Sequence, residues 1–198
     1  MNYARRVILF GVIVLMAVTL GRVVAAAKHA TEPRAVFSGD KLLRPDGYRE
    51  WIYLSSGLGM NYSPAPGTHE MFTNVFVAPW AYRAFVASGK WPDGTWFVVE
   101  DRDQATKESI NKSGHFQTDL MGLGVEVKDE KRFADKWAYF AFGTDDKTAV
   151  AMPRASCWEC HEQNAAVEHS FVQFYPTLKP VAEKFGMYRE RGEGAARP

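Results

Sequence analysis

Apolar positions come in short runs along most of the chain, and these runs are rich in aromatic and β-branched residues. Turn-forming residues separate them, notably at 64–67, 92–94 and 143–146. Short runs of this kind between turn signals are typical of antiparallel strands. The predicted strands are 51–54, 74–77, 95–100, 115–120, 125–128 and 136–142.

Helical spacing is less common. Pro79 suits a first helical turn, the apolar residues that follow recur at helical spacing, and Gly89 suits the helix end. A second short helix is expected at 157–161 and a third at 178–185, just before a glycine. The sequence therefore predicts an α+β domain, mainly an antiparallel β-sheet with a few short helices packed at its ends.

The amino terminus has the pattern of a secretory signal. Arg5 and Arg6 precede an uncharged apolar run over 7–20, and 25–27 offers a small-residue cleavage site. A helix of that run would be about 21 Å long, short of the roughly 30 Å hydrocarbon core. We expect 1–27 to be a signal peptide for the general secretory route. The alternative is a retained anchor that includes Arg22 and faces the periplasm.

Composition changes this outline little. Segment 28–36 is predicted to be a flexible leader, 37–186 one soluble domain, and 187–198 a disordered tail. Without the three arginines of the leader, 21 basic residues face 23 acidic ones, a net charge near −2. This balance gives no indication of nucleic-acid binding and no clear steering toward a redox partner.

The chemistry is concentrated in residues 157–161, which read C-x-x-C-H. Two thiols one helical turn apart can form thioethers with the two vinyl groups of haem, and the next residue then lies under the iron. Cys157 and Cys160 are thus predicted to hold one covalently attached haem c, with His161 as the axial iron ligand. Because haem is attached outside the cytoplasm, the motif agrees with export to the periplasm.

Other interpretations of the motif are a zinc site, a redox dithiol and a structural disulfide. Structural zinc needs four ligands, yet the chain has two cysteines, both in the motif, and His169 would have to supply another. A thioredoxin-like dithiol needs a βαβ context, which is not found around 148–156. A disulfide would not require the histidine.

Several stretches resemble the cytochrome P-460 family. They are 48–53, 127–133, 137–140 and 171–176, with C-x-x-C-H between the last two. The resemblance covers about 37–186. It implies a β-rich c-type cytochrome, usually a homodimer, with a five-coordinate haem at one side of the sheet and a distal face open to a small ligand.

The resemblance also exposes two departures from the branch that oxidises hydroxylamine. Val99 stands where that branch carries a lysine cross-linked to the porphyrin, and 148–156 lacks the acidic residue that precedes the motif. The chain is therefore closer to the cytochrome c-prime-beta branch. Phe97 and Val99 should face the haem from one strand, in an apolar pocket without a proton donor or base. The alternative for Phe97 is a core aromatic that never touches ligand.

The leading functional hypothesis is an exported mono-haem cytochrome that binds NO or a related diatomic ligand, for scavenging, sensing or one-electron transfer. A second is an enzyme that oxidises hydroxylamine or NO and passes electrons to a partner cytochrome. A third is a six-coordinate electron carrier. The sixth ligand in that case would come from residues that carry no spacing signal: His69, His115, His169, Met71, Met121 and Met152.

Overall fold

The computed structural model describes residues 32–60 and 69–190. The predicted signal segment 1–27 lies outside them, as do residues 28–31 of the predicted leader and 191–198 of the predicted tail. Within the described residues, no helix has the length and apolar character needed to cross a membrane. These residues form an α+β fold dominated by antiparallel sheet, as predicted.

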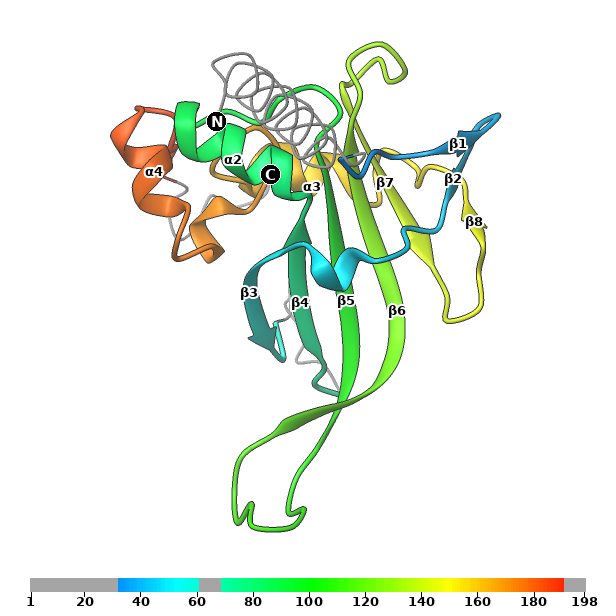
Figure 1. Ribbon diagram of the computed structural model, residues 1–198, viewed down its shortest axis with the longest axis vertical. Helices are drawn as coiled ribbons and strands as arrows, with labels where there is room; N and C mark the ends of the chain where they lie inside the picture. Colours follow the sequence, from blue (N-terminus) through cyan, green and yellow to red (C-terminus); the bar gives the residue numbers. More distant parts are fainter. Residues whose placement is uncertain (1–31, 61–68, 191–198) are drawn as a thin grey trace, which may run out of the picture. The chain divides into compact units, whose positions relative to one another are not determined.

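Five strands form the larger sheet, in the order β3-β4-β5-β6-β7, and each strand pairs antiparallel with its neighbours. The strands run in chain order, so each connection returns the chain directly beside the strand it has left. Figure 1 shows the β5–β6 hairpin extending well beyond the other strands. The bounds are β3 (Ile52–Leu58), β4 (Phe72–Val77), β5 (Trp96–Ala105), β6 (Phe116–Lys128) and β7 (Trp137–Phe142).

The predicted strands are all present, with one correction. The runs 115–120 and 125–128 are not separate strands, because they belong to the single strand β6. The intervening residues include two glycines, which weaken the apolar pattern without ending the strand, although the pairing with β5 shifts register between Gly122 and Leu120. Register shifts near Arg102 mark irregular pairing where the hairpin leaves the rest of the sheet.

Three short strands form a second sheet in the order β1-β2-β8, with bounds β1 (Phe37–Ser38), β2 (Lys41–Leu43) and β8 (Thr148–Ala149). It covers part of one face of the larger sheet, where Phe37 packs against Phe140 of β7 with 5.9 Å between ring centroids. The carboxyl-terminal third of the chain packs against the other face of the larger sheet, where Tyr175 contacts Phe97 of β5.

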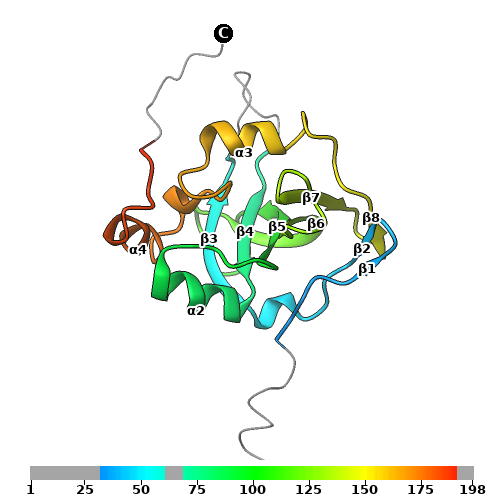
Figure 2. The same cartoon turned by 90° about the horizontal axis from the view of Figure 1, so that it is seen from above.

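All three predicted helices are confirmed, and Figure 1 shows them gathered near one end of the strands. They are α2 (Pro79–Ser88), α3 (Trp158–Asn164) and α4 (Lys179–Lys184), with the 3-10 turns η1 (Tyr48–Glu50) and η2 (Val172–Phe174). Pro79 occupies the first turn of α2, and Gly89 ends the helix in the left-handed conformation at φ 70°. Figure 2 shows α3 and α2 on either side of the strands.

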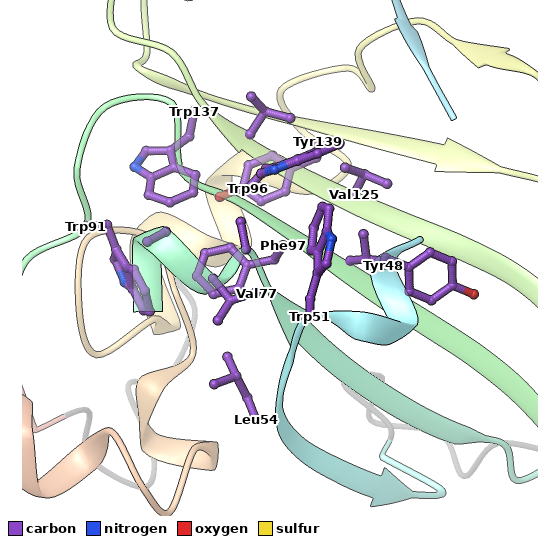
Figure 3. Close-up of a cluster of buried hydrophobic side chains, with 14 of the residues drawn as sticks. Tyr48, Trp51, Leu54, Val77, Trp91, Trp96, Phe97, Val125, Trp137 and Tyr139 are labelled. Atoms are coloured by element: carbon purple, nitrogen blue, oxygen red, sulfur yellow. The ribbon is translucent and has the colours of Figure 1, made fainter. Parts of the chain in front are cut away.

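The core is unusually aromatic, as the close-up in Figure 3 shows. Phe97 on β5 is fully buried, and its ring packs at 4.8 Å from Trp91, 6.2 Å from Trp137 and 6.4 Å from Tyr175. Core packing also continues beyond 186, because Met187 and Tyr188 pack against the buried cluster. The N–H of Arg189 also donates to the Ala166 carbonyl. The sheet and the carboxyl-terminal segment are thus joined through one apolar core.

Candidate functional site

The C-x-x-C-H motif lies at the start of α3. Cys157 caps the helix, and the His161 N–H donates to the Cys157 carbonyl at 3.1 Å, which closes one helical turn around both thiols. The two cysteines are free thiols; Cys160 is exposed and Cys157 is half-buried. Burial, together with the nearby Glu126, raises the pKa of the Cys157 thiol. Local sequence therefore suffices to place both thiols and the histidine on one turn.

The orientation of the His161 ring is set by a distant residue. Its Nδ1 lies 2.7 Å from the carbonyl oxygen of His169. A carbonyl can only accept, so Nδ1 carries the proton and donates it. The Nε2 atom is then left with a lone pair. This is the second-sphere hydrogen bond that metal-binding histidines typically make, and it prepares Nε2 to ligate a metal.

A pocket opens beside this ring. Its cavity volume is about 150 Å³. Strands β3, β4 and β5 supply Gly57, Val75 and Val99 on one side. The segment after α3 supplies the aromatic residues Phe171, Phe174 and Tyr175. The lining is mainly apolar, as predicted, and the pocket lies between the larger sheet and the carboxyl-terminal third of the chain.

Glu126 on β6 is the polar exception in this pocket. Its Oε1 lies 3.9 Å from His161 Nε2, and its Oε2 is buried without a hydrogen-bond partner among the described residues. Burial raises the pKa of this carboxyl, and the proximity of His161 lowers it to a smaller extent. The prediction of a pocket without a proton donor or base is therefore wrong.

The two residues of β5 that were predicted to face the haem, Phe97 and Val99, lie in different surroundings. Both point to the same face of the sheet, because they are two positions apart on the strand. Val99 lines the pocket, whereas Phe97 lies in the core beneath it and contacts the pocket residue Tyr175. This placement agrees with the alternative that Phe97 is a core aromatic.

None of the six candidate sixth ligands is among the pocket residues. His69 pairs with Asp103, and His115 with Gln104, both on strand β5. His169 instead contributes its backbone carbonyl to His161. The methionine that does line the pocket is Met60, which sequence reasoning missed.

Of the two missed residues, only Glu126 has a signal in the sequence. Glu126 is a lone acid near the end of β6, flanked by two buried valines. Alternation along a strand places such an acid on one face alone, so a buried acid there needs a functional or structural reason. Met60 has no such signal. Only the structure shows that a Cβ atom at Gly57 would lie 2.1 Å from the Met60 sulfur, so the glycine makes room for it.

The competing interpretations of the motif gain no support. The described residues contain no cluster of three or more His, Cys, Asp or Glu side chains that could hold a zinc ion. Strand pairing in both sheets is antiparallel, so the βαβ context of a thioredoxin-like dithiol is missing from the described fold. The cysteines are also not paired with each other.

The residues present fit a haem. A β-rich cytochrome that attaches its haem through C-x-x-C-H needs free thiols one turn apart, a histidine with Nδ1 engaged and Nε2 available, and an apolar pocket beside it. All of these are present here. The sequence model of the cytochrome P460 family matches residues 45–172, and the chain belongs to this family. Membership identifies the protein as a haem cytochrome. A comparison with curated proteins found no significant match.

Proposed function

We propose that this protein is a mono-haem c-type cytochrome whose iron binds a small nitrogen-oxide or other diatomic ligand such as NO. Cys157 and Cys160 would hold the haem c covalently, and His161 would be its protein-derived axial ligand. The iron supplies the redox and ligand-binding centre. The protein's own residues orient the axial ring, exclude bulk water and set the polarity around the ligand.

The observation that carries this proposal is the His161 ring, with Nδ1 held by the His169 carbonyl and Nε2 beside an apolar pocket. Valine and aromatic side chains exclude hydrated anions, whereas an uncharged diatomic enters at little desolvation cost. None of the strong candidate ligands His69, His115 and His169 lines the pocket, which supports an exchangeable sixth position.

The assignment to the cytochrome c-prime-beta branch is part of the proposal. Val99 lines the pocket at the position where the resemblance would place the cross-linking lysine, and no lysine is among the pocket residues of the described chain. The buried Lys128 is engaged elsewhere, because its Nζ donates to the Trp91 carbonyl at 2.7 Å. A valine has no amine that could attack the porphyrin edge.

The test is the visible absorption spectrum of the haem-loaded, reduced protein before and after CO is added. We expect a c-type spectrum that shifts with CO. His161→Ala, matched with His115→Ala on the β5–β6 hairpin, should alter the spectrum and the CO response, while the control should not. A spectrum unaffected by CO would refute the open sixth position, and Met60 would then be the first residue to test as the internal ligand.

Oxidation of hydroxylamine, with electrons passed to a partner cytochrome, is a second candidate, and Glu126 specifically favours it. This oxidation releases protons as well as electrons, so a base near the substrate assists it. Glu126 is buried in the pocket with one oxygen unpartnered, so a substrate N–H or O–H group could donate to it. The carboxyl thus offers a proton acceptor where the segment before the motif offers none.

Turnover of hydroxylamine with an added electron acceptor distinguishes the two candidates. Enzymatic oxidation predicts steady turnover that falls at least tenfold in Glu126→Gln, while the exposed control Glu108→Gln keeps the parental rate. Binding of CO without hydroxylamine turnover would leave ligand binding as the function.

Export, periplasmic location and homodimer formation complete the proposal. They rest on the signal pattern in 1–27 and on the resemblance to the family. Fractionation of expressing cells followed by haem staining would test the location, with a retained anchor expected to move the protein to the membrane fraction. Light scattering of the purified protein would give its oligomeric state.

A further inference from the structure

A strained turn follows α3 and carries the carbonyl that holds His161. It consists of Val167, Glu168, His169 and Ser170 and is here called the 167–170 turn. Glu168 has φ 42° and His169 has φ 65°, and the Ser170 N–H donates to the Val167 carbonyl at 2.7 Å. Two consecutive left-handed residues within such a hydrogen-bonded turn define type I′, which normally requires glycine or asparagine. Neither central residue here is of that kind, so the surrounding structure has to hold the turn.

Ser170 provides the first restraint. Its hydroxyl donates to the Val167 carbonyl at 2.6 Å and accepts from the Trp91 indole N–H at 2.7 Å. Ser170 is fully buried and Trp91 is 1% exposed, so water cannot replace either bond. The turn is therefore closed internally and tied to the segment that precedes β5.

Lys128 provides the second restraint. Its ammonium lies 2.9 Å from the Glu168 carboxylate and donates to the Trp91 carbonyl at 2.7 Å. Lys128 is 7% exposed, and a lysine is rarely buried to this extent unless it is paired. Lys128, at the end of β6, thus holds the side chain of Glu168, the first left-handed residue of the turn. Ser170, which follows the second left-handed residue, holds the other end of the turn.

We propose that the 167–170 turn is a positioning device for the axial histidine, with Ser170, Lys128 and Glu168 as positioning residues that act through the His169 carbonyl. The inference rests on the proposed role of His161 as iron ligand. In the left-handed conformation this carbonyl lies 2.7 Å from Nδ1. The backbone strain then has a function, since it fixes both the ring plane and the tautomer of the ligand.

The direction of the effect follows from ligand chemistry. A strong hydrogen bond from Nδ1–H makes the imidazole a better electron donor through Nε2 and favours ferric over ferrous iron. A loosened turn weakens that bond. The reduction potential should then rise, and the iron–histidine stretching frequency of the ferrous protein should fall.

The experiment uses the haem-loaded protein and three single variants. Ser170→Ala removes the internal closure and leaves the Trp91 indole without its acceptor, whereas Glu168→Ala is a milder change that removes the Lys128 tether at a less buried position. Ser88→Ala at the end of α2 is the matched control, because it also removes a hydroxyl bonded to a backbone carbonyl. The readouts are the midpoint potential, the iron–histidine stretch by resonance Raman spectroscopy, and the urea midpoint of unfolding.

We expect Ser170→Ala and Glu168→Ala to raise the potential and lower the stretching frequency, with the larger shift in Ser170→Ala and none in Ser88→Ala. If Ser170→Ala does not fold, Glu168→Ala decides alone. A lower unfolding midpoint with unchanged potential and stretch would show a merely structural turn and overturn the inference, while the proposed function would stand. Absence of histidine ligation in the unsubstituted protein would reject both.

Discussion

Phe97 and Val99 allow a sharp test of which β5 side chains build the core and which build the pocket. Phe97 is fully buried among three aromatic rings, whereas Val99, two positions along the same face, lines the pocket. We predict that Phe97→Ala lowers stability and leaves ligand binding by the folded fraction unchanged. Val99→Ala should change ligand binding and leave stability nearly unchanged.

The loss in the free energy of unfolding can be worked out from how each side chain packs. Truncation of a buried phenylalanine to alanine costs about 3–5 kcal/mol, and each aromatic pair contributes about 0.5–1.5 kcal/mol. With three ring partners, Phe97→Ala should lie near the top of that range, against a total stability of about 5–15 kcal/mol. Phe97→Leu retains most of the volume and should cost about 1–2 kcal/mol. For Val99→Ala, at a partly exposed pocket wall, about 1 kcal/mol or less is expected.

The assay is urea unfolding of the haem-loaded protein, extrapolated linearly to water, together with CO titration of its ferrous form. Phe97→Leu is the decisive variant, because it stays folded. A tenfold change in its CO affinity, equivalent to about 1.4 kcal/mol, with less than 1 kcal/mol lost in stability would refute the assignment of Phe97 to the core.

Four further predictions concern the haem site. Changing both Cys157 and Cys160 to alanine should abolish haem staining on a denaturing gel, and full staining would refute covalent attachment. Mass analysis of haem peptides should find no third protein linkage, and Val99→Lys should change the haem spectrum. The raised pKa of Glu126 means that the folded state keeps a proton that the unfolded chain has released; stability should therefore fall as pH rises from the usual glutamate range through the raised value. Glu126→Gln should flatten this decline in urea unfolding free energies, and an equal slope in both proteins would contradict the assignment.

Glu126 also changes how the two functional candidates compare. An apolar pocket alone favours an uncharged diatomic, while a buried carboxyl with a raised pKa can hold a proton at a pH where an exposed glutamate has released it. The absence of an acid from 148–156 therefore does not remove acid–base chemistry from the pocket, because β6 supplies a carboxyl from another direction.

Sequence alone determined the features that depend on local spacing. The C-x-x-C-H motif places two thiols and a histidine on one helical turn, because a turn contains 3.6 residues wherever it occurs. Alternation along β5 placed Phe97 and Val99 on one face, and Pro79 with Gly89 bounded α2. These predictions needed no information from distant parts of the chain.

Only the tertiary structure decided which distant residues come into contact with His161. The carboxyl of Glu126 and the carbonyl of His169 reach His161 from β6 and from a strained turn, and no local pattern specifies either approach. The same face of β5 becomes core at Phe97 and pocket at Val99, because the segment after α3 packs over the first and leaves space over the second. Contacts of this kind depend on how elements distant in sequence pack together, and periodicity within one element carries no information about them.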